Sequence, residues 1–313
     1  MISDALRRAG FMGTRPRGRL ARRENLEGWL FASPWILGFL IFTLGPMVAS
    51  AALSFAQWDI VTPPKWIGFD NFERLGTDAS ALHALKVTTV YAVVSVPLQI
   101  VLGVILALLL NAKISGLRIY RTIYYLPAVL SGVAVALLWR WIFSKEFGLL
   151  NLGLSFLGIE GPGWLTDPDW ALWALILMSL WGVGDSMVIY LAGLQGIPTE
   201  LYEAAEVDGA NIIRRFFNIT LPLLTPVLFF QLIIGIIRSL QVFVQAFIMT
   251  DGGPADATLF YVLYLYRNAF LYFRMGYASL LAWVLFVYVL LLTLLVFRSA
   301  RFWVYYESEA RSR

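Results

Sequence analysis

The sequence predicts an all-α integral membrane protein with six transmembrane helices. Three observations support this fold class. Of the 313 residues, 59% are hydrophobic and only 14% are charged, whereas about a quarter of a soluble domain is charged. Six apolar stretches are each long enough to cross a hydrocarbon core, which takes about 20 helical residues. Basic residues also gather in alternate loops, the distribution that orients membrane proteins.

Each apolar stretch is expected to be a helix, because unpaired backbone groups are not tolerated in lipid. Barrel strands would show alternation over segments of about ten residues, and the run VLGVILALLL at 101–110 does not alternate. Residues 259–273 are also apolar, but Arg267 and Asn268 interrupt them. We expect an interfacial helix there and not a seventh span. The six predicted spans are residues 29–55, 87–110, 122–142, 171–194, 222–248 and 277–297.

The first stretch follows an arginine-rich start, as the apolar part of a cleavable signal does. Ala49-Ser50-Ala51 would supply small residues for cleavage. The apolar run is too long for a signal, however, and it contains Pro34 and Pro46. We therefore expect the first stretch to remain as a span.

The basic residues predict that both termini are cytoplasmic, because such residues accumulate on cytoplasmic loops. An even number of spans also requires both termini on one side. The chain then divides into a basic cytoplasmic segment (1–28), a transmembrane domain (29–297) and a cytoplasmic tail (298–313). We expect the basic segment to meet anionic lipid headgroups and not nucleic acid. The predicted outer side has six basic residues: Lys65, Arg74, Lys86, Lys145, Arg267 and Arg274. The predicted cytoplasmic side has sixteen: Arg7, Arg8, Arg15, Arg17, Arg19, Arg22, Arg23, Lys113, Arg118, Arg121, Arg214, Arg215, Arg298, Arg301, Arg311 and Arg313.

The connection between spans four and five is unusually long. Residues 195–222 read QGIPTELYEAAEVDGANIIRRFFNITLP, whereas helix connections usually run about two to eight residues. The pattern predicts two short helices: Thr199 caps the first, Gly209 ends it, and Pro222 opens span five. From the residues alone, the pair fits either a protein-docking surface or amphipathic helices on lipid.

This loop resembles the EAA signature of permease subunits of importers of the ATP-binding-cassette (ABC) superfamily. The signature is Glu-Ala-Ala, three residues, Gly, nine residues, Ile, one residue and Leu-Pro, and every spacing is satisfied here. Four other stretches resemble the carbohydrate-uptake branch, at 124–143, 191–198, 249–258 and 273–283, although Asp251 stands where family permeases often have glycine. The signature residues are Glu203, Ala204, Ala205, Gly209, Ile219, Leu221 and Pro222.

The resemblance implies a set of partners in a bacterial or archaeal cytoplasmic membrane. The EAA loop, residues 195–222, would couple the spans to an ATPase dimer by docking in a cleft of the ATPase. Glu203 would make polar contacts there, the alanines would allow close packing and Gly209 would make the turn. A second permease, homologous but different, would complete the path. Outer loops at 58–84 and 144–170 would receive a solute-binding protein that delivers a sugar.

Polar residues in spans four and five predict a substrate path. Gln231, Arg238, Gln241 and Gln245 fall within an arc of roughly 80° at about 100° per residue. Buried polar groups in spans are costly and usually functional, and amides and guanidinium groups suit sugar hydroxyls. Hydrogen bonding between helices alone is the alternative. Asp185 is the one acid deep in a span and is the candidate partner of Arg238.

The chain is expected to be a transport subunit and not an enzyme. A phosphate loop needs Gly-Lys, and none of the four lysines follows glycine. ATP and Mg²⁺ are therefore expected on the partner ATPase, with no cofactor in this chain. One histidine and no cysteine argue against a metal site or a nucleophile–base pair. The alternatives are an ion-coupled transporter or channel, disfavoured by the lack of evident repeats, and a permease for a non-sugar solute.

Overall fold

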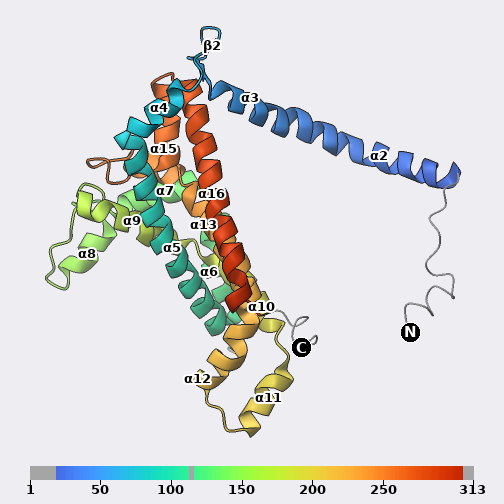
Figure 1. Cartoon of the computed structure of the whole chain (residues 1–313). Helices are drawn as coiled ribbons and strands as arrows, with labels where there is room; N and C mark the ends of the chain where they lie inside the picture. Colours follow the sequence, from blue (N-terminus) through green and yellow to red (C-terminus); the bar gives the residue numbers. More distant parts are fainter. Residues whose placement is uncertain (1–18, 113–115, 306–313) are drawn as a thin grey trace.

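The computed structural model describes residues 19–112 and 116–305. The predicted basic segment up to residue 18, Lys113, and the tail from residue 306 lie outside these described residues. The helices form one elongated bundle, from which the first span projects as an arm (Figure 1). One end of the bundle carries α11 and α12 and is called the loop end. The opposite end carries a small β-hairpin and α4 and is called the hairpin end.

The arm is a single long helix that leaves the bundle at the hairpin end. None of its residues from Arg22 to Leu53 is buried. Its last turns contact α16, and Trp283 Nε1 donates to Ser50 Oγ at 3.1 Å. A wide π-helical turn ends two residues before Pro46, where it relieves the clash of the proline ring with the preceding turn. The arm comprises α2 (Arg19–Phe39), η1 (Leu40–Leu44) and α3 (Gly45–Leu53).

The hairpin end is built from a short antiparallel pair and one helix. Ala56 lies opposite Trp66 in the hairpin. The Asn71 side-chain amide donates to the carbonyls of Ser54 and Ala56 at 2.9 and 3.0 Å, which holds α4 against the hairpin. The elements are β1 (Ala56–Gln57), β2 (Lys65–Trp66) and α4 (Asp70–Thr77).

Spans two to four differ in their continuity. Span two is the unbroken helix α5, whereas spans three and four each consist of two helices, which meet at 101° and 48°. The prediction of continuous helices over 122–142 and 171–194 is therefore wrong. The elements are α5 (Ala79–Asn111), α6 (Leu117–Val129), α7 (Gly132–Ile142), α8 (Leu149–Ser155) in the following loop, α9 (Pro168–Trp181) and α10 (Gly184–Gln195).

The remaining elements begin with the EAA loop and end with a long last span. Four helices of the described chain are long and apolar enough to cross a membrane, and the two bent pairs bring the number of spans to six. The elements are α11 (Thr199–Val207), α12 (Ile212–Arg215), η2 (Phe216–Thr220), α13 (Leu221–Leu240), α14 (Val244–Met249), α15 (Tyr261–Tyr266), η3 (Arg267–Leu271) and α16 (Met275–Trp303).

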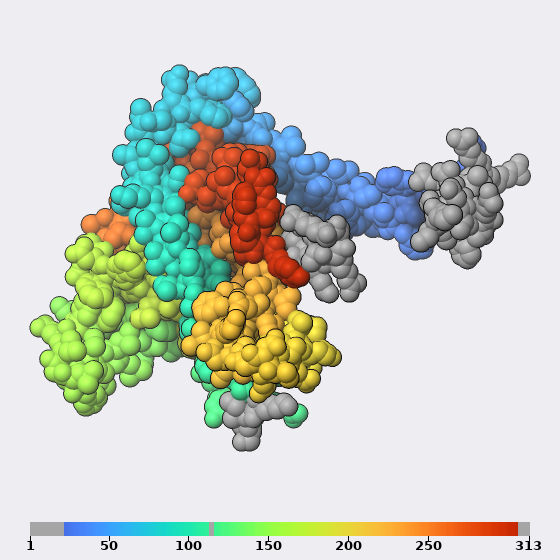
Figure 2. Space-filling model, turned by 60° about the horizontal axis from the view of Figure 1, so that its bottom comes forward, coloured from blue at the N-terminus to red at the C-terminus, as the bar shows by residue number. Residues whose placement is uncertain are grey.

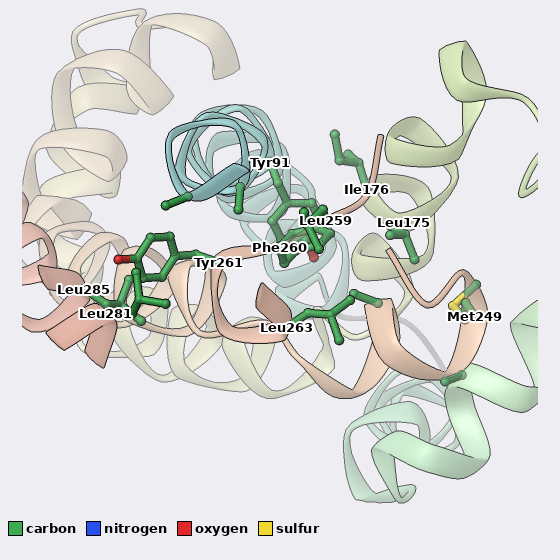
Figure 3. Close-up of a cluster of buried hydrophobic side chains, with 14 of the residues drawn as sticks. Tyr91, Leu175, Ile176, Met249, Leu259, Phe260, Tyr261, Leu263, Leu281 and Leu285 are labelled. Carbon is green, nitrogen blue, oxygen red and sulfur yellow. The ribbon is translucent and has the colours of Figure 1, made fainter. Parts of the chain in front are cut away.

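The segment expected to form an interfacial helix, over 259–273, packs into the core from residue 259 to residue 269. Its apolar residues face α5 and α16, and Tyr91 of α5 meets Phe260 edge-on at 5.0 Å (Figure 3). Tyr261 packs beside Leu281 of α16, and its backbone N–H donates to Thr88 Oγ1 at 2.8 Å. The segment is too short to be a seventh span, as predicted. Its apolar side chains pack against protein up to Ala269, whereas residues 270–273 are exposed.

Candidate functional site

A polar cavity of about 310 Å³ lies inside the bundle, at the lower end of the range for small-molecule sites of about 300–1,000 Å³. Helices from spans two to five form its walls. Its polar lining combines amides, hydroxyls and one charged pair. These groups belong to Tyr91, Gln99, Ser179, Asp185, Ser186, Tyr190, Gln231, Arg238, Ser239 and Gln245.

Three spans are interrupted beside this cavity. Span three breaks at Leu130 and Ser131, span four at Gly182 and Val183, and span five at 241–243. Residues from all three breaks line the cavity. Non-helical backbone at membrane depth persists only where it is buried in protein or faces water. The breaks are therefore part of the cavity wall and expose backbone polar groups to its contents.

Glycine allows the close approach that fixes span four beside span three. A Cβ on Gly184 would lie 2.1 Å from the Tyr124 carbonyl oxygen and 3.0 Å from the Tyr125 Cα. Only glycine therefore fits at this contact between α10 and α6. The contact places the first turn of α10, which carries Asp185, at the cavity wall.

The pairing of Asp185 with Arg238 is confirmed. Arg238 Nη1 donates to Asp185 Oδ2 at 2.7 Å and joins α13 to α10. The other carboxylate oxygen accepts from the Ser186 N–H at 2.7 Å, and the N-terminal turn of a helix favours an acid at this position. The Arg238 side chain is still 69% exposed, so its remaining N–H groups are available to a ligand.

The predicted stripe on span five is only partly assembled. Gln231 and Gln245 line the cavity beside Arg238. Gln241 lies just beyond the end of α13 and lines a separate cavity beside Ala282 of α16. The helix ends at Leu240, so the step of about 100° per residue does not extend to Gln241.

Several lining residues were missed from the sequence. Gln99 Nε2 donates to Ser179 Oγ at 3.0 Å, which joins α5 to α9 at the cavity. Tyr190 and Ser186 of α10 add two hydroxyls. Gln99 was detectable, because it is an amide in an otherwise apolar span two residues after Pro97. The serines and tyrosines had no comparable signal, because both are common in ordinary helix packing.

The turn predicted at Gly209 is present. Its φ is +72°, and its N–H donates to the Glu206 carbonyl at 3.0 Å while the next N–H, of Ala210, donates to Ala205 at 2.9 Å. This pair of bonds is the Schellman ending of a helix, which favours glycine. The predicted cap at Thr199 is wrong. Pro198 takes the extended cap position with ψ 131°, so Thr199 is already helical and makes no capping bond.

The second helix of the EAA loop and span five form one continuous helix, from Ile212 to Leu240. Pro222 therefore lies inside this helix and does not open a new one. The reason is the π-helical turn η2, in which the Leu221 N–H donates to the Phe216 carbonyl, five residues back. This turn is one residue wider than an α-helical turn and leaves room for the ring of Pro222. Asn211 caps the start by accepting from the Arg214 N–H at 2.8 Å.

The seven signature residues divide into two groups. Glu203, Ala204 and Gly209 are exposed on α11 and its turn, and Ala205 is half-buried. Ile219 is half-buried and packs toward the core, and Leu221 and Pro222 are half-buried in the long helix. The loop extends beyond the bundle in Figure 1, and Figure 2 shows it, in yellow, at the surface that faces the viewer. The first group therefore forms an exposed surface on α11 and its turn, and the second group belongs to the long helix that supports this surface.

Comparison with known proteins identifies the class. Residues 99–304 match the family described as binding-protein-dependent transport system inner membrane component. The chain belongs to this family, which confirms the predicted resemblance to ABC importer permeases.

Individual relatives cover nearly the whole chain. It is 49% identical to the "Probable ABC transporter permease protein YesP" of Bacillus subtilis (strain 168), over 94% of this chain and 96% of that one. It is 37% identical to the "Lactose transport system permease protein LacF" of Rhizobium radiobacter, over 93% and 99%. A chain of a bacterial alginate ABC transporter, solved in complex with an alginate pentasaccharide-bound periplasmic protein, matches with a TM-score of 0.80 and 28% identity, over 91% and 98%.

Proposed function

We propose that the chain carries a sugar or oligosaccharide across the cytoplasmic membrane, as one permease subunit of an importer that a separate ATPase energises. The observation that carries this proposal is one continuous helix, Ile212–Leu240. At one end it supports the exposed EAA loop, and near the other it places Arg238 in the polar cavity. The lactose and alginate transport systems among the relatives support a sugar as the solute.

The cavity lining suits a neutral polar solute. Gln99, Gln231 and Gln245 offer amides that both donate and accept hydrogen bonds, as sugar hydroxyls do. The charge of Arg238 is balanced by Asp185 at 2.7 Å. Trp181 adds an aromatic ring to the wall, which can cover the apolar face of a sugar ring. The cavity therefore matches a sugar, whose surface combines hydroxyl groups with apolar C–H faces.

The projecting arm supports a second permease subunit as a partner. From residue 29 to residue 53 it is predominantly apolar and exposed, and it touches the bundle only near its last turns. A helix of this kind must be covered by lipid or by another membrane helix. In an importer built from two permeases, the arm would reach across and pack on the second subunit.

The importer scheme also assigns the energy source to a partner ATPase and orients the chain in the membrane. The exposed part of the EAA loop, with Glu203 and Ala204, would dock on an ATPase dimer in the cytoplasm, where ATP and Mg²⁺ bind. The hairpin end would face outward and meet a solute-binding protein. Basic residues on α12, Arg214 and Arg215, lie at the loop end, which agrees with that orientation.

The proposal is tested by reconstituting the chain into proteoliposomes with its partner ATPase, second permease and solute-binding protein. Uptake of labelled oligosaccharides is expected only with ATP and the solute-binding protein, and the purified chain alone should hydrolyse no ATP. Uptake driven by an ion gradient without ATP, or ATP turnover by the isolated chain, would overturn the assignment.

A further inference from the structure

We propose that a cationic pocket at the hairpin end receives a carboxylate side chain of the solute-binding protein. This inference rests on the proposed function, because it names the contact that an importer's solute-binding protein makes with this chain. The pocket, called the cationic pocket, has a volume of about 500 Å³ and is separate from the substrate cavity. Lys65 of β2, Arg74 of α4 and Arg274 before α16 supply its positive charge.

The walls of the cationic pocket are fixed by backbone contacts. The Trp58 carbonyl accepts from the Met275 N–H at 2.9 Å, which ties the hairpin to the start of α16. A Cβ on Gly276 would lie 1.9 Å from the Ala56 carbonyl oxygen, so glycine permits this contact. Asn71 holds α4 to the same strand. The three cations therefore stand on one preformed frame, which reduces the entropy cost of binding a partner.

The charge balance favours an anion. Among the described residues, none of Lys65, Arg74 and Arg274 makes a salt bridge. Two carboxylates also line the pocket, Asp59 and Asp70. Asp59 Oδ1 is already occupied by the Val61 N–H and by the Thr62 N–H and hydroxyl, at 2.8 to 3.2 Å. An incoming carboxylate would find more positive than negative charge.

The rim indicates a protein as the occupant. Trp66 and Phe69 are 72% and 65% exposed. Trp66 stacks on Phe55 and Phe69 meets it edge-on, but neither lines the pocket. Val61, at the hairpin tip, is 84% exposed. Interfaces are enriched in aromatic residues and arginine. A ligand that contacts both the rim and the pocket must be larger than the pocket, which fits a folded protein with an acidic side chain.

A cation–π contact and hydrogen bonds link the cationic pocket to α5, α15 and α16. Arg74 lies over the Tyr277 ring at 4.5 Å. The hydroxyls of Tyr277 and Tyr264 both donate to Asp78 Oδ2 at 2.6 Å, and Asp78 Oδ1 caps α5. Since α5 carries Gln99 into the substrate cavity, a docked carboxylate would act on the ends of the helices that line the path.

The test measures binding of the solute-binding protein to the whole importer complex in nanodiscs. Arg274→Glu and Lys65→Glu should each weaken binding about tenfold at low salt, and less at high salt, because each converts attraction into repulsion. The matched variant Arg274→Lys keeps the charge and should stay within about threefold of the original affinity. A lysine at the partnering acid of the solute-binding protein should restore binding to Arg274→Glu.

The outcomes separate this inference from the proposed function. Binding unchanged by both reversals, in a complex that still imports sugar, overturns the inference alone. A reversal that lowers uptake while leaving affinity for the solute-binding protein unchanged also overturns it, because the pocket would then act on free sugar. Failure of the unaltered complex to import any sugar would instead overturn the proposed function.

Discussion

Arg238 and Asp185 form the one ion pair within the substrate cavity, and their roles are separable by mutation. Asp185→Asn leaves the Arg238 guanidinium without its carboxylate partner at 2.7 Å. We expect it to lower sugar uptake about tenfold or more, because an unpaired charge at membrane depth reorganises the site. The double variant Asp185→Asn with Arg238→Gln removes both charges and should recover part of the uptake. Uptake by the reconstituted importer measures both.

The matched control is Gln241→Ala. Gln241 belongs to the same predicted stripe but lies outside the cavity, so its uptake should equal that of the unaltered chain. An equal loss in Gln241→Ala and Asp185→Asn would contradict the assignment of the cavity.

Gly184 is expected to be the least replaceable small residue of span four. In Gly184→Ala the new Cβ would lie 2.1 Å from the Tyr124 carbonyl oxygen, which forces α10 away from α6. Overpacking of this kind typically costs about 1–3 kcal/mol. The midpoint of thermal unfolding in detergent should fall. Gly76→Ala, where nothing lies within 4 Å, is the matched control. It should leave the midpoint unchanged or raise it slightly, because alanine is favoured over glycine in a helix.

The hydrogen-bonded carboxylate of Asp78 is expected to make the protein less stable in acid. Burial alone would raise its pKa, but hydrogen bonds from Tyr264, Tyr277 and the N–H groups of Ala81 and Ser80 outweigh burial and hold the pKa below its usual 3.8. Because the folded pKa is depressed, the stabilisation is complete above about pH 4 and is lost as pH falls through the folded value. Burial and the bond to Asp78 raise the pKa of Tyr264 to about 12, so this donor stays protonated.

Unfolding midpoints measured against pH should therefore be flat from pH 8 to about 5 and decline below pH 4. Asp78→Asn should lower the midpoint at pH 7 and flatten the acid decline. An acid decline of the same size in Asp78→Asn and in the unaltered chain would rule out this carboxylate as its source.

At the scale of single elements, Gly209 is the position at which the EAA loop depends on its backbone. Its φ is +72°, but a Cβ there would meet nothing within 4 Å. Gly209→Ala thus tests conformation without steric contact, and the left-handed backbone should cost about 1 kcal/mol. We expect uptake and ATPase activity that depends on the solute-binding protein to fall together.

The control for this substitution is Gly153→Ala in α8, which also has nothing within 4 Å and no positive φ. It should leave both activities unchanged. If Gly209→Ala supports full coupled activity, the turn is not needed for docking of the ATPase.

The sequence predicts the transmembrane helices better than it predicts the breaks within them. Six long apolar runs and the Gly209 turn are visible because hydrophobicity and glycine have direct physical consequences. The breaks at Leu130 and Val183 lie inside long apolar runs. Glycines stand beside both breaks, Gly132 at the first and Gly182 and Gly184 at the second, but a glycine in an apolar run also fits an unbroken helix with close packing.

The break after Leu240 has no proline or glycine within three residues. Tertiary contacts stabilise it: α14 packs on α7, and the ring of Phe243 meets that of Tyr266 of α15 at 5.0 Å. Gln241 was therefore assigned to the wrong cavity.

At the scale of the whole molecule, orientation is open to a direct test because the chain contains no cysteine. Single cysteines can be introduced at Val207 in α11 and Val61 in the hairpin, which are 88% and 84% exposed at opposite ends. In intact cells, a membrane-impermeant maleimide should label Val61→Cys. It should label Val207→Cys only after the membrane is opened. The reverse pattern would invert the proposed topology.

The helix that begins at Ile212 is 29 residues long, or about 43 Å at 1.5 Å per residue. A stiff rod of this length amplifies rotation into displacement. Tilting it by about 5° around the level of Arg238, roughly 39 Å from Ile212, would shift its tip by roughly 3 Å. Tyr202 and Glu206 fasten α11 to this helix at Thr220 and Arg215. A push by an ATPase surface on α11 would therefore change the direction of this helix at Arg238, and with it the angle at which the guanidinium meets Asp185 of α10. The hydrogen bonds within the helix itself would stay in place.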